Sequence, residues 1–208
     1  LTIRSIQFKD LAEGLMLTSD GLYRSTDGGI NWNKVSEQYG NILSYFANGK
    51  AFLADNKTLF KYESGSLTRP TGIGDDVNQL DIRSIAFPEP TNNNKAYLTA
   101  NFHWRRLYKT IDGGNSFTEV TKLSLGTEFA SDFSPGAISF ASPQVGMIVE
   151  AQPSGVSRDH FYIYTTSDGG VTWTKRESKA AAGMTSLRLF DATHAWASDG
   201  SHLFKFTP

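Results

Sequence analysis

The sequence contains no cysteine in its 208 residues. The chain therefore forms no disulfide bond, no thiolate metal site and no cysteine nucleophile, although the cellular compartment stays open. No apolar run reaches the length of a membrane-spanning helix, so we expect no transmembrane segment. The formal net charge is -1 with both signs mixed along the chain, which gives no electrostatic reason to expect nucleic acid or an anionic membrane as a partner.

A helical period of useful length is also missing. The best candidate, residues 178–184, is too short to be a stable helix on its own, and we interpret it as a loop or a single turn. Elsewhere apolar and polar residues alternate in short runs, which is typical of β-strands. The sequence predicts an all-β fold.

One motif occurs three times, at residues 22–35, 107–117 and 164–173. Each copy has a hydroxyl residue, one spacer, Asp, one spacer, Gly, two spacers and then Trp or Phe. Repetition of so specific a pattern indicates duplication. The fixed residues are Ser25, Asp27, Gly29 and Trp32 in the first copy, Thr110, Asp112, Gly114 and Phe117 in the second, and Thr166, Asp168, Gly170 and Trp173 in the third.

The motif predicts a hairpin turn between two strands. Glycine reaches positive φ without a steric clash, and Asp-Gly between alternating runs is a strong hairpin signal. The carboxylate and the hydroxyl can satisfy backbone groups of the turn. The aromatic residue then begins the return strand, and it is buried only if another hairpin packs beside it. We therefore expect the copies to stack.

The motif resembles the Asp-box, also called the BNR repeat, of sialidases, sortilin-type receptors, xyloglucan-degrading hydrolases and photosystem II assembly factors. In these families the Asp-box joins the third and fourth strands of a β-propeller blade, far from the ligand face. The resemblance implies a propeller in which the motif residues are structural. It implies nothing about catalysis.

Repeats extend beyond the three motifs. Residues 3–8 recur almost unchanged as residues 82–87, with looser relatives at 42–46, 137–140 and 187–190. The aromatic residues that close them are about 40 to 50 residues apart, which is the length of a four-stranded blade. These aromatic residues are Phe8, Phe46, Phe87, Phe140 and Phe190.

The repeats predict a β-propeller of about five four-stranded blades with the last blade incomplete. We expect one domain over residues 1–208, with blades at about 1–37, 38–70, 80–121, 136–177 and 185–208. Because the chain begins at Leu1 and its fifth unit stops before a fourth strand, we expect it to be part of a longer protein.

The loops on the face opposite the Asp-Gly-Gly turns are unequal. Two second-to-third-strand loops are long, at 101–105 and 152–160, and so are the blade connections at 69–81 and 121–136. Long loops in compact domains are often functional. The candidate ligand-binding residues of this sector are His103, Trp104, Arg105, Glu128, Asp132, Arg158, Asp159 and His160.

These candidates have competing interpretations. The cluster at 103–106, which includes Arg106, can stack a sugar ring or bind a carboxylate or phosphate. Alternatively, Trp104 packs between blades and the arginines are solvated. The Arg158-Asp159-His160 run is either an oriented acid–base group or a loop that pairs its own charges. We expect His194 and His202 to lie inside strands as packed or edge residues.

Catalytic and metal chemistry have little support. His103 and His160 with Asp132 or Glu128 lack tight ligand spacing, so we expect no metal and no other cofactor. Glycoside hydrolysis needs two carboxyl groups, which Asp75 or Asp76 with Glu128 or Asp132 would supply. The arginine triad and Tyr-Glu pair of sialidases are missing, so we reject sialidase activity.

The expected function is a non-catalytic binding or assembly module that recognises a protein partner through the loop face opposite the turns. The alternative is a glycan-binding, lectin-like module or a glycoside hydrolase-related domain of a secreted protein. A purely structural domain of a larger protein is a third hypothesis. The oligomeric state stays open. The family resemblance implies an extracytoplasmic location, which is periplasmic, secreted or at the cell surface.

Overall fold

A computed structural model describes residues 1–45, 49–55, 58–73, 81–89, 94–102, 104–120, 135–151, 161–178 and 183–206, with only the backbone given at 81, 101, 102, 104 and 105. All regular structure in these ranges is β-strand, as the sequence predicts. None of the described residues form a helix long and apolar enough to cross a membrane.

The described strands form five antiparallel sheets in which strands follow one another in sequence order. The first four sheets have four strands each and the fifth has three. Their bounds are β1 (Ile3–Phe8), β2 (Gly14–Thr18), β3 (Leu22–Ser25) and β4 (Asn33–Ser36); β5 (Ile42–Tyr45), β6 (Ala51–Ala54), β7 (Leu59–Glu63) and β8 (Ser66–Thr68); β9 (Asp81–Ala86), β10 (Ala96–Phe102), β11 (Trp104–Thr110) and β12 (Thr118–Glu119); β13 (Pro135–Phe140), β14 (Gly146–Glu150), β15 (Phe161–Thr166) and β16 (Thr174–Ser178); and β17 (Ser186–Leu189), β18 (Ala195–Ser198) and β19 (Leu203–Phe206).

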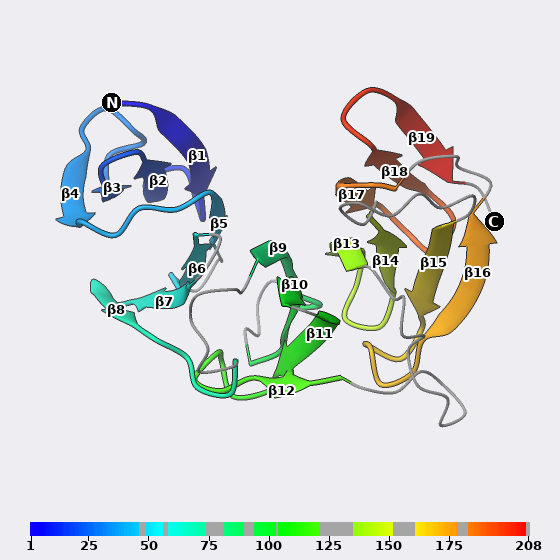
Figure 1. Cartoon of the computed structure of the whole chain (residues 1–208). Coiled ribbons are helices and arrows are strands. Elements are labelled where there is room, and N and C mark those ends of the chain that lie inside the picture. The colour runs from blue at the N-terminus through cyan, green and yellow to red at the C-terminus, as the bar shows by residue number, and fades with distance from the viewer. Residues whose placement is uncertain are drawn as a thin grey trace.

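The sheets are arranged as blades along an arc (Figure 1). The first strand of each sheet lies on the inside of the arc and the last strand lies outside. Successive first strands contact one another, β1 with β5, β5 with β9, β9 with β13 and β13 with β17. The view shows the first and fifth sheets at separate ends of the arc. The predicted propeller architecture is confirmed.

The three Asp-Gly-Gly turns share one hydrogen-bond network. The hydroxyl of Thr110 donates to Asp112 Oδ1 at 2.8 Å and accepts from the backbone N–H of Gly114 at 3.0 Å. Asp112 also accepts from the backbone N–H of Ser116 at 3.0 Å. The Ser25 and Thr166 turns repeat this arrangement. The hydrogen bonds from Ser116 hold the pKa of Asp112 well below its usual range.

Strand register corrects the predicted closing aromatics. Phe8 pairs with Gly14, and Phe140 pairs with Gly146. In the second sheet the residue paired with the start of the second strand is Tyr45, opposite Ala51, rather than Phe46, which lies outside the described residues. In the fifth sheet it is Leu189, opposite Ala195, and the predicted Phe190 is exposed. The prediction for the fifth sheet is off by one residue, and a shift of one residue places a side chain on the other face of a strand.

Two aromatic rings cross from one sheet into the next. Phe52 of β6 lies 5.7 Å from the ring of Phe87 and 5.7 Å from the ring of Phe117 in the third sheet. Tyr97 of β10 stacks on Phe140 at 5.2 Å and meets the edge of Trp173 at 6.1 Å in the fourth sheet. We refer to the receiving pairs as aromatic slots and to the inserted rings as plugs.

Glycine makes room for both plugs. A Cβ at Gly114 would lie 2.0 Å from Cζ of Phe52, and one at Gly170 would lie 2.4 Å from the hydroxyl oxygen of Tyr97. Both glycines also have positive φ, 81° and 80°. The second Gly of each of these two turns is therefore needed for packing between sheets as well as for the turn itself.

A polar cluster joins the first two sheets instead. Glu13 accepts from Lys9 Nζ at 2.5 Å, from Arg24 Nε at 2.9 Å and from the hydroxyl of Tyr45 at 2.8 Å. Burial alone would raise the pKa of Glu13, but these three donors outweigh it and lower the pKa to about 2. Gln7 adds a bond to the carbonyl oxygen of Leu43 at 2.7 Å.

Candidate functional site

Most of the predicted ligand-binding residues lie outside the described ranges. These are His103, Glu128, Asp132, Arg158, Asp159 and His160. For Trp104 and Arg105 only the backbone is described. The predicted carboxyl pairs fall outside as well, since Asp75 and Asp76 are also not described. The ligand-binding assignments therefore stay predictions.

The backbone around this cluster differs from the predicted loop. Asn101 pairs with Arg105 and Phe102 pairs with Trp104, so β10 and β11 continue as a hairpin almost to its tip. β14, by comparison, ends at Glu150. This residue corresponds to Ala100 when both strands are counted from the residue that pairs with the hydroxyl residue of the turn, which is Ala96 opposite Thr110 and Gly146 opposite Thr166. β10 thus continues two residues further than β14, about 6–7 Å, at the edge opposite the Asp-Gly-Gly turns.

Arg106 has a structural partner. Its guanidinium forms a short ion pair with Glu119 of β12, so it is fixed to the outer strand of its own sheet. Its Nε atom is buried without a hydrogen-bond partner. This differs from the interpretation in which the arginines of the cluster are simply solvated.

Glu150 is a buried carboxylate that sequence reasoning missed. It closes β14 at the edge opposite the turns and is 1% exposed. Its carboxylate accepts from the hydroxyl of Tyr164 at 3.1 Å and from the backbone N–H of Tyr162 at 3.1 Å. Buried carboxylates are rare unless they are paired. Glu150 lies at the same edge as the predicted ligand-binding loops, opposite the Asp-Gly-Gly turns. The only sequence signal was an acid ending the apolar run Gly-Met-Ile-Val.

The two C-terminal histidines lie in turns, which corrects the prediction that they are inside strands. His194 precedes β18 and His202 precedes β19, and both are exposed. Nδ1 of His194 lies 2.9 Å from Asp191, and Nδ1 of His202 lies 3.1 Å from Asp199. Each Asp also accepts backbone N–H bonds, so these are Asp-centred turns. Within the described ranges, no three or more His, Asp or Glu side chains are grouped to hold a metal ion.

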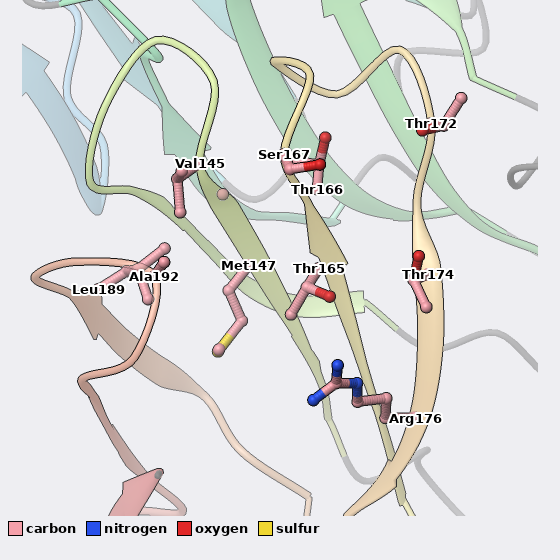
Figure 2. A pocket seen from close by; sticks show the side chains of 11 residues that line it. Val145, Met147, Thr165, Thr166, Ser167, Thr172, Thr174, Arg176, Leu189 and Ala192 are labelled. Carbon is pink, nitrogen blue, oxygen red and sulfur yellow. The ribbon is translucent and has the colours of Figure 1, made fainter. Parts of the chain in front are cut away.

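A pocket of about 320 Å³ lies between the fourth and fifth sheets (Figure 2). Leu189 and Ala192 line one side, and Met147, Thr165 and Arg176 line the other. It lies at the edge that carries the Asp168 turn, whereas the expected site is at the opposite edge. The pocket exists because Met147 faces Leu189 here, where Tyr97 faces Phe140 and Trp173 one sheet earlier.

The chemistry of this pocket is limited. Arg176 is the one charged side chain among its lining residues. The hydroxyls of Thr166 and Thr172 are bonded to Asp168. The pocket therefore offers hydroxyl groups and one guanidinium without an acid–base pair, which suits binding a small polar group better than catalysis.

No family model and no curated protein matches this sequence. The Asp-box relationship accordingly stays a prediction from the motif. The fold, in contrast, is similar to solved β-propellers.

Two of the similar structures are of YCF48. The structure of YCF48 from Cyanidioschyzon merolae is 17% identical with a TM-score of 0.63, and the match covers all of this chain and 66% of that one. A second, "YCF48 bound to D1 peptide", is 15% identical with a TM-score of 0.66, and covers 99% and 65%. The chain thus spans just under two thirds of these proteins.

Glycoside hydrolases of family GH74 also match. The GH74 xyloglucanase from Xanthomonas campestris is 18% identical with a TM-score of 0.67, over 93% of this chain and 34% of that one. An ancestral GH74 enzyme is 15% identical with a TM-score of 0.72, over 98% and 30%. At such identities the likeness concerns the fold alone.

Proposed function

We propose that this chain is a non-catalytic binding module that recognises a segment of another protein through the propeller edge opposite its Asp-Gly-Gly turns. The observation that carries the proposal is the hairpin of β10 and β11, in which β10 continues two residues further than β14 of the next sheet and β11 bears Trp104 and Arg105. A projecting strand pair offers alternating side chains and backbone groups to an extended peptide. Trp and Arg are also the residue types most enriched at binding hot spots.

Two further observations support it. A structurally similar protein, YCF48, has been solved with a bound peptide. Among the described carboxylates, Asp27, Asp112, Asp168, Asp191 and Asp199 are bound within turns, and Glu13 and Glu119 are in ion pairs. Such carboxylates serve the fold.

The alternative is glycan recognition, favoured by the likeness to GH74 enzymes and by the hydroxyl-lined pocket beside Arg176. A glycan would bind at the edge that carries the Asp168 turn. The two functions therefore predict that substitutions at different residues weaken binding. The extracytoplasmic location expected from the motif is a separate proposal, which cell fractionation would test.

A paired array experiment tests the choice. The chain is applied to an array of unstructured peptides and to an array of plant and bacterial glycans. We expect peptide hits that weaken at least about tenfold in Trp104→Ala and Arg105→Ala. The matched control is Ile111→Ala, an exposed side chain in the turn at the other edge, which should bind normally.

Other results would overturn the proposal. Glycan hits that are lost in Arg176→Ala, with no peptide hits, would establish the alternative. Hits on neither array, or a fall in melting temperature of Trp104→Ala that matches its loss of binding, would argue for a structural role of the hairpin.

A further inference from the structure

The first strands of three successive sheets carry a polar residue at one shared position. Ile-Arg-Ser-Ile occurs at residues 3–6 and again at 82–85, so Arg4 and Arg83 are equivalent residues of the repeat. Both lie four residues before the aromatic residue that ends the repeat, and Asn41 lies four residues before the matching aromatic residue of the second sheet. The shared position thus bears two guanidinium groups and one amide, which all donate hydrogen bonds.

The shared position is a β-bulge. The residues on either side of Arg4 pair with consecutive residues of β2, and those on either side of Arg83 pair with consecutive residues of β10, so each arginine is an extra residue. The N–H of Asn41 donates to the carbonyl oxygen of Ala54 at 2.9 Å, although Ala54 pairs with Ile42. A bulge takes its extra side chain out of the regular alternation of the strand, and bulges are frequent beside functional sites.

Asn41 and Arg83 face the inside of the arc. β5 lies between β1 and β9, and β9 lies between β5 and β13, so the second and third sheets are covered on both faces. β6 and β10 pair with the outer side of β5 and β9. Asn41 and Arg83 are nevertheless exposed. The uncovered side that is left to them is the inside of the arc, which the first strands line (Figure 1).

The inside of the arc is positively charged although the chain as a whole is not. The chain has 20 Lys and Arg against 21 Asp and Glu. Among the described side chains of the five first strands, however, there are three arginines, Arg4, Arg83 and Arg188, and no carboxylate. Asp81 begins β9, and only its backbone is described. A concave surface lined by charge of one sign concentrates ions of the other sign.

We propose that the inside of the arc is an anion-binding surface, which holds a carboxylate or phosphate group through Arg4, Asn41 and Arg83. β1, β5 and β9 follow one another along the arc, so the amide lies between the two guanidinium groups. The guanidinium fork matches the paired oxygen atoms of a carboxylate or phosphate. The surface uses none of the hairpin residues of the proposed function and stands independently of it. The anionic group comes from a free anion or from an acidic segment of a bound protein.

Isothermal titration calorimetry with three probes tests the proposal. The probes are inorganic phosphate, a peptide of alternating Glu and Gly, and a peptide of the same length in which Gln replaces Glu. We expect phosphate, the Glu peptide or both to bind at low ionic strength and more weakly as sodium chloride is added, while the Gln peptide does not bind. Binding of phosphate alone would identify a free anion as the ligand, and binding of the Glu peptide alone would identify an acidic segment.

Substitutions assign the binding to the bulge residues. Combining Arg4→Gln with Arg83→Gln should weaken binding at least about tenfold. Arg83→Lys keeps the charge and loses the fork, so it should weaken binding less than Arg83→Gln. The matched control is Arg69→Gln, which removes the same charge from an exposed arginine that follows the outer strand β8 and lies over the ring of Phe60. Arg69→Gln and Trp104→Ala should both bind like wild type.

Other results would overturn the proposal. These are no binding of either phosphate or the Glu peptide, or equal affinities for the Glu and Gln peptides. Equal losses in the double variant and in Arg69→Gln would mean that net charge alone explains the binding. A fall in the melting temperature of the double variant that accounts for its loss of affinity would show that the arginines serve the fold. Loss of binding in Trp104→Ala would move the anion to the hairpin.

Discussion

The hydroxyl of Tyr97 in the third sheet donates a 2.7 Å hydrogen bond to the carbonyl oxygen of Gly169 in the fourth. The bond joins a plug to the Asp-Gly-Gly turn that receives it, so one side chain fixes both the ring packing and the position of the turn. Burial, with a smaller contribution from the charge of Asp168, raises the pKa of Tyr97 to about 12. The phenol thus stays a donor at physiological pH.

Removing this hydroxyl separates the two roles. Tyr97→Phe should lower the free energy of unfolding by about 1 kcal/mol, because the carbonyl of Gly169 loses its donor while the ring stays. Tyr97→Ala should lower it by about 3–5 kcal/mol, because the slot becomes a cavity. Urea denaturation measures both, with the exposed Tyr39→Phe as control. Equal losses for Phe and Ala would mean that ring packing contributes nothing.

Two glycines with nearly the same φ test whether the slot needs glycine for space. Gly114 has φ 81° and Gly65 has φ 86°, but a Cβ at Gly65 would meet nothing within 4 Å. Gly65→Ala should therefore lower the free energy of unfolding by the backbone strain alone, about 1–2 kcal/mol. Gly114→Ala adds overlap with Phe52 and should cost about 1–3 kcal/mol more. Adding Phe52→Leu to the Gly114→Ala variant should recover part of that excess. A loss of unfolding free energy for Gly114→Ala that is no larger than for Gly65→Ala would contradict the packing role.

The sequence predicted local features well because they depend on few residues. The three turns need only a hydroxyl, Asp, Gly and an aromatic residue at fixed spacing, and each forms the network that these groups can make. The all-β class followed from strand alternation and the lack of a helical period. The number of sheets followed from the five repeats of the first-strand segment.

Features that depend on register or on neighbouring sheets were not predictable in the same way. Tyr45-Phe46 and Leu189-Phe190 each offer two adjacent apolar residues, and only pairing shows which one faces the previous sheet. The turns before His194 and His202 look like strand starts until Asp191 and Asp199 are seen to bond the backbone. The plugs did have a signal, an alanine followed by an aromatic residue, which sequence reasoning did not use.

The pocket between the fourth and fifth sheets predicts a stabilising substitution. Leu189 occupies the register position of Phe140 and lines this pocket. Leu189→Phe should raise the free energy of unfolding by about 0.5–2 kcal/mol by filling part of the volume beside Met147. Leu203→Phe, at an exposed site of the same sheet, should be neutral in the same urea experiment. Destabilisation by Leu189→Phe would show that the pocket walls do not admit a ring.

The Glu13 cluster should make the contact between the first and second sheets sensitive to acid. The pKa of Glu13 is about 2 in the folded chain, against an ordinary value of 4.5. A carboxyl whose pKa is lower when folded stabilises the fold fully above the unfolded value, and this contribution is lost as the pH falls from about 4.5 toward 2. At neutral pH we expect the contribution to be about 1–3 kcal/mol, since the group is partly screened by solvent.

The measurement is the difference in unfolding free energy between wild type and Glu13→Gln across this pH range. The difference should be largest at neutral pH and should shrink on acidification, because protonated Glu13 and Gln both lack the charge that holds Lys9 and Arg24. Glu37→Gln, at an exposed ion pair with Lys34, is the matched control and should change stability little. A difference that does not vary with pH would mean that Glu13 acts by shape alone. In that case the charges of the polar cluster would not stabilise the contact between the first two sheets as the aromatic plugs stabilise the contacts between later sheets.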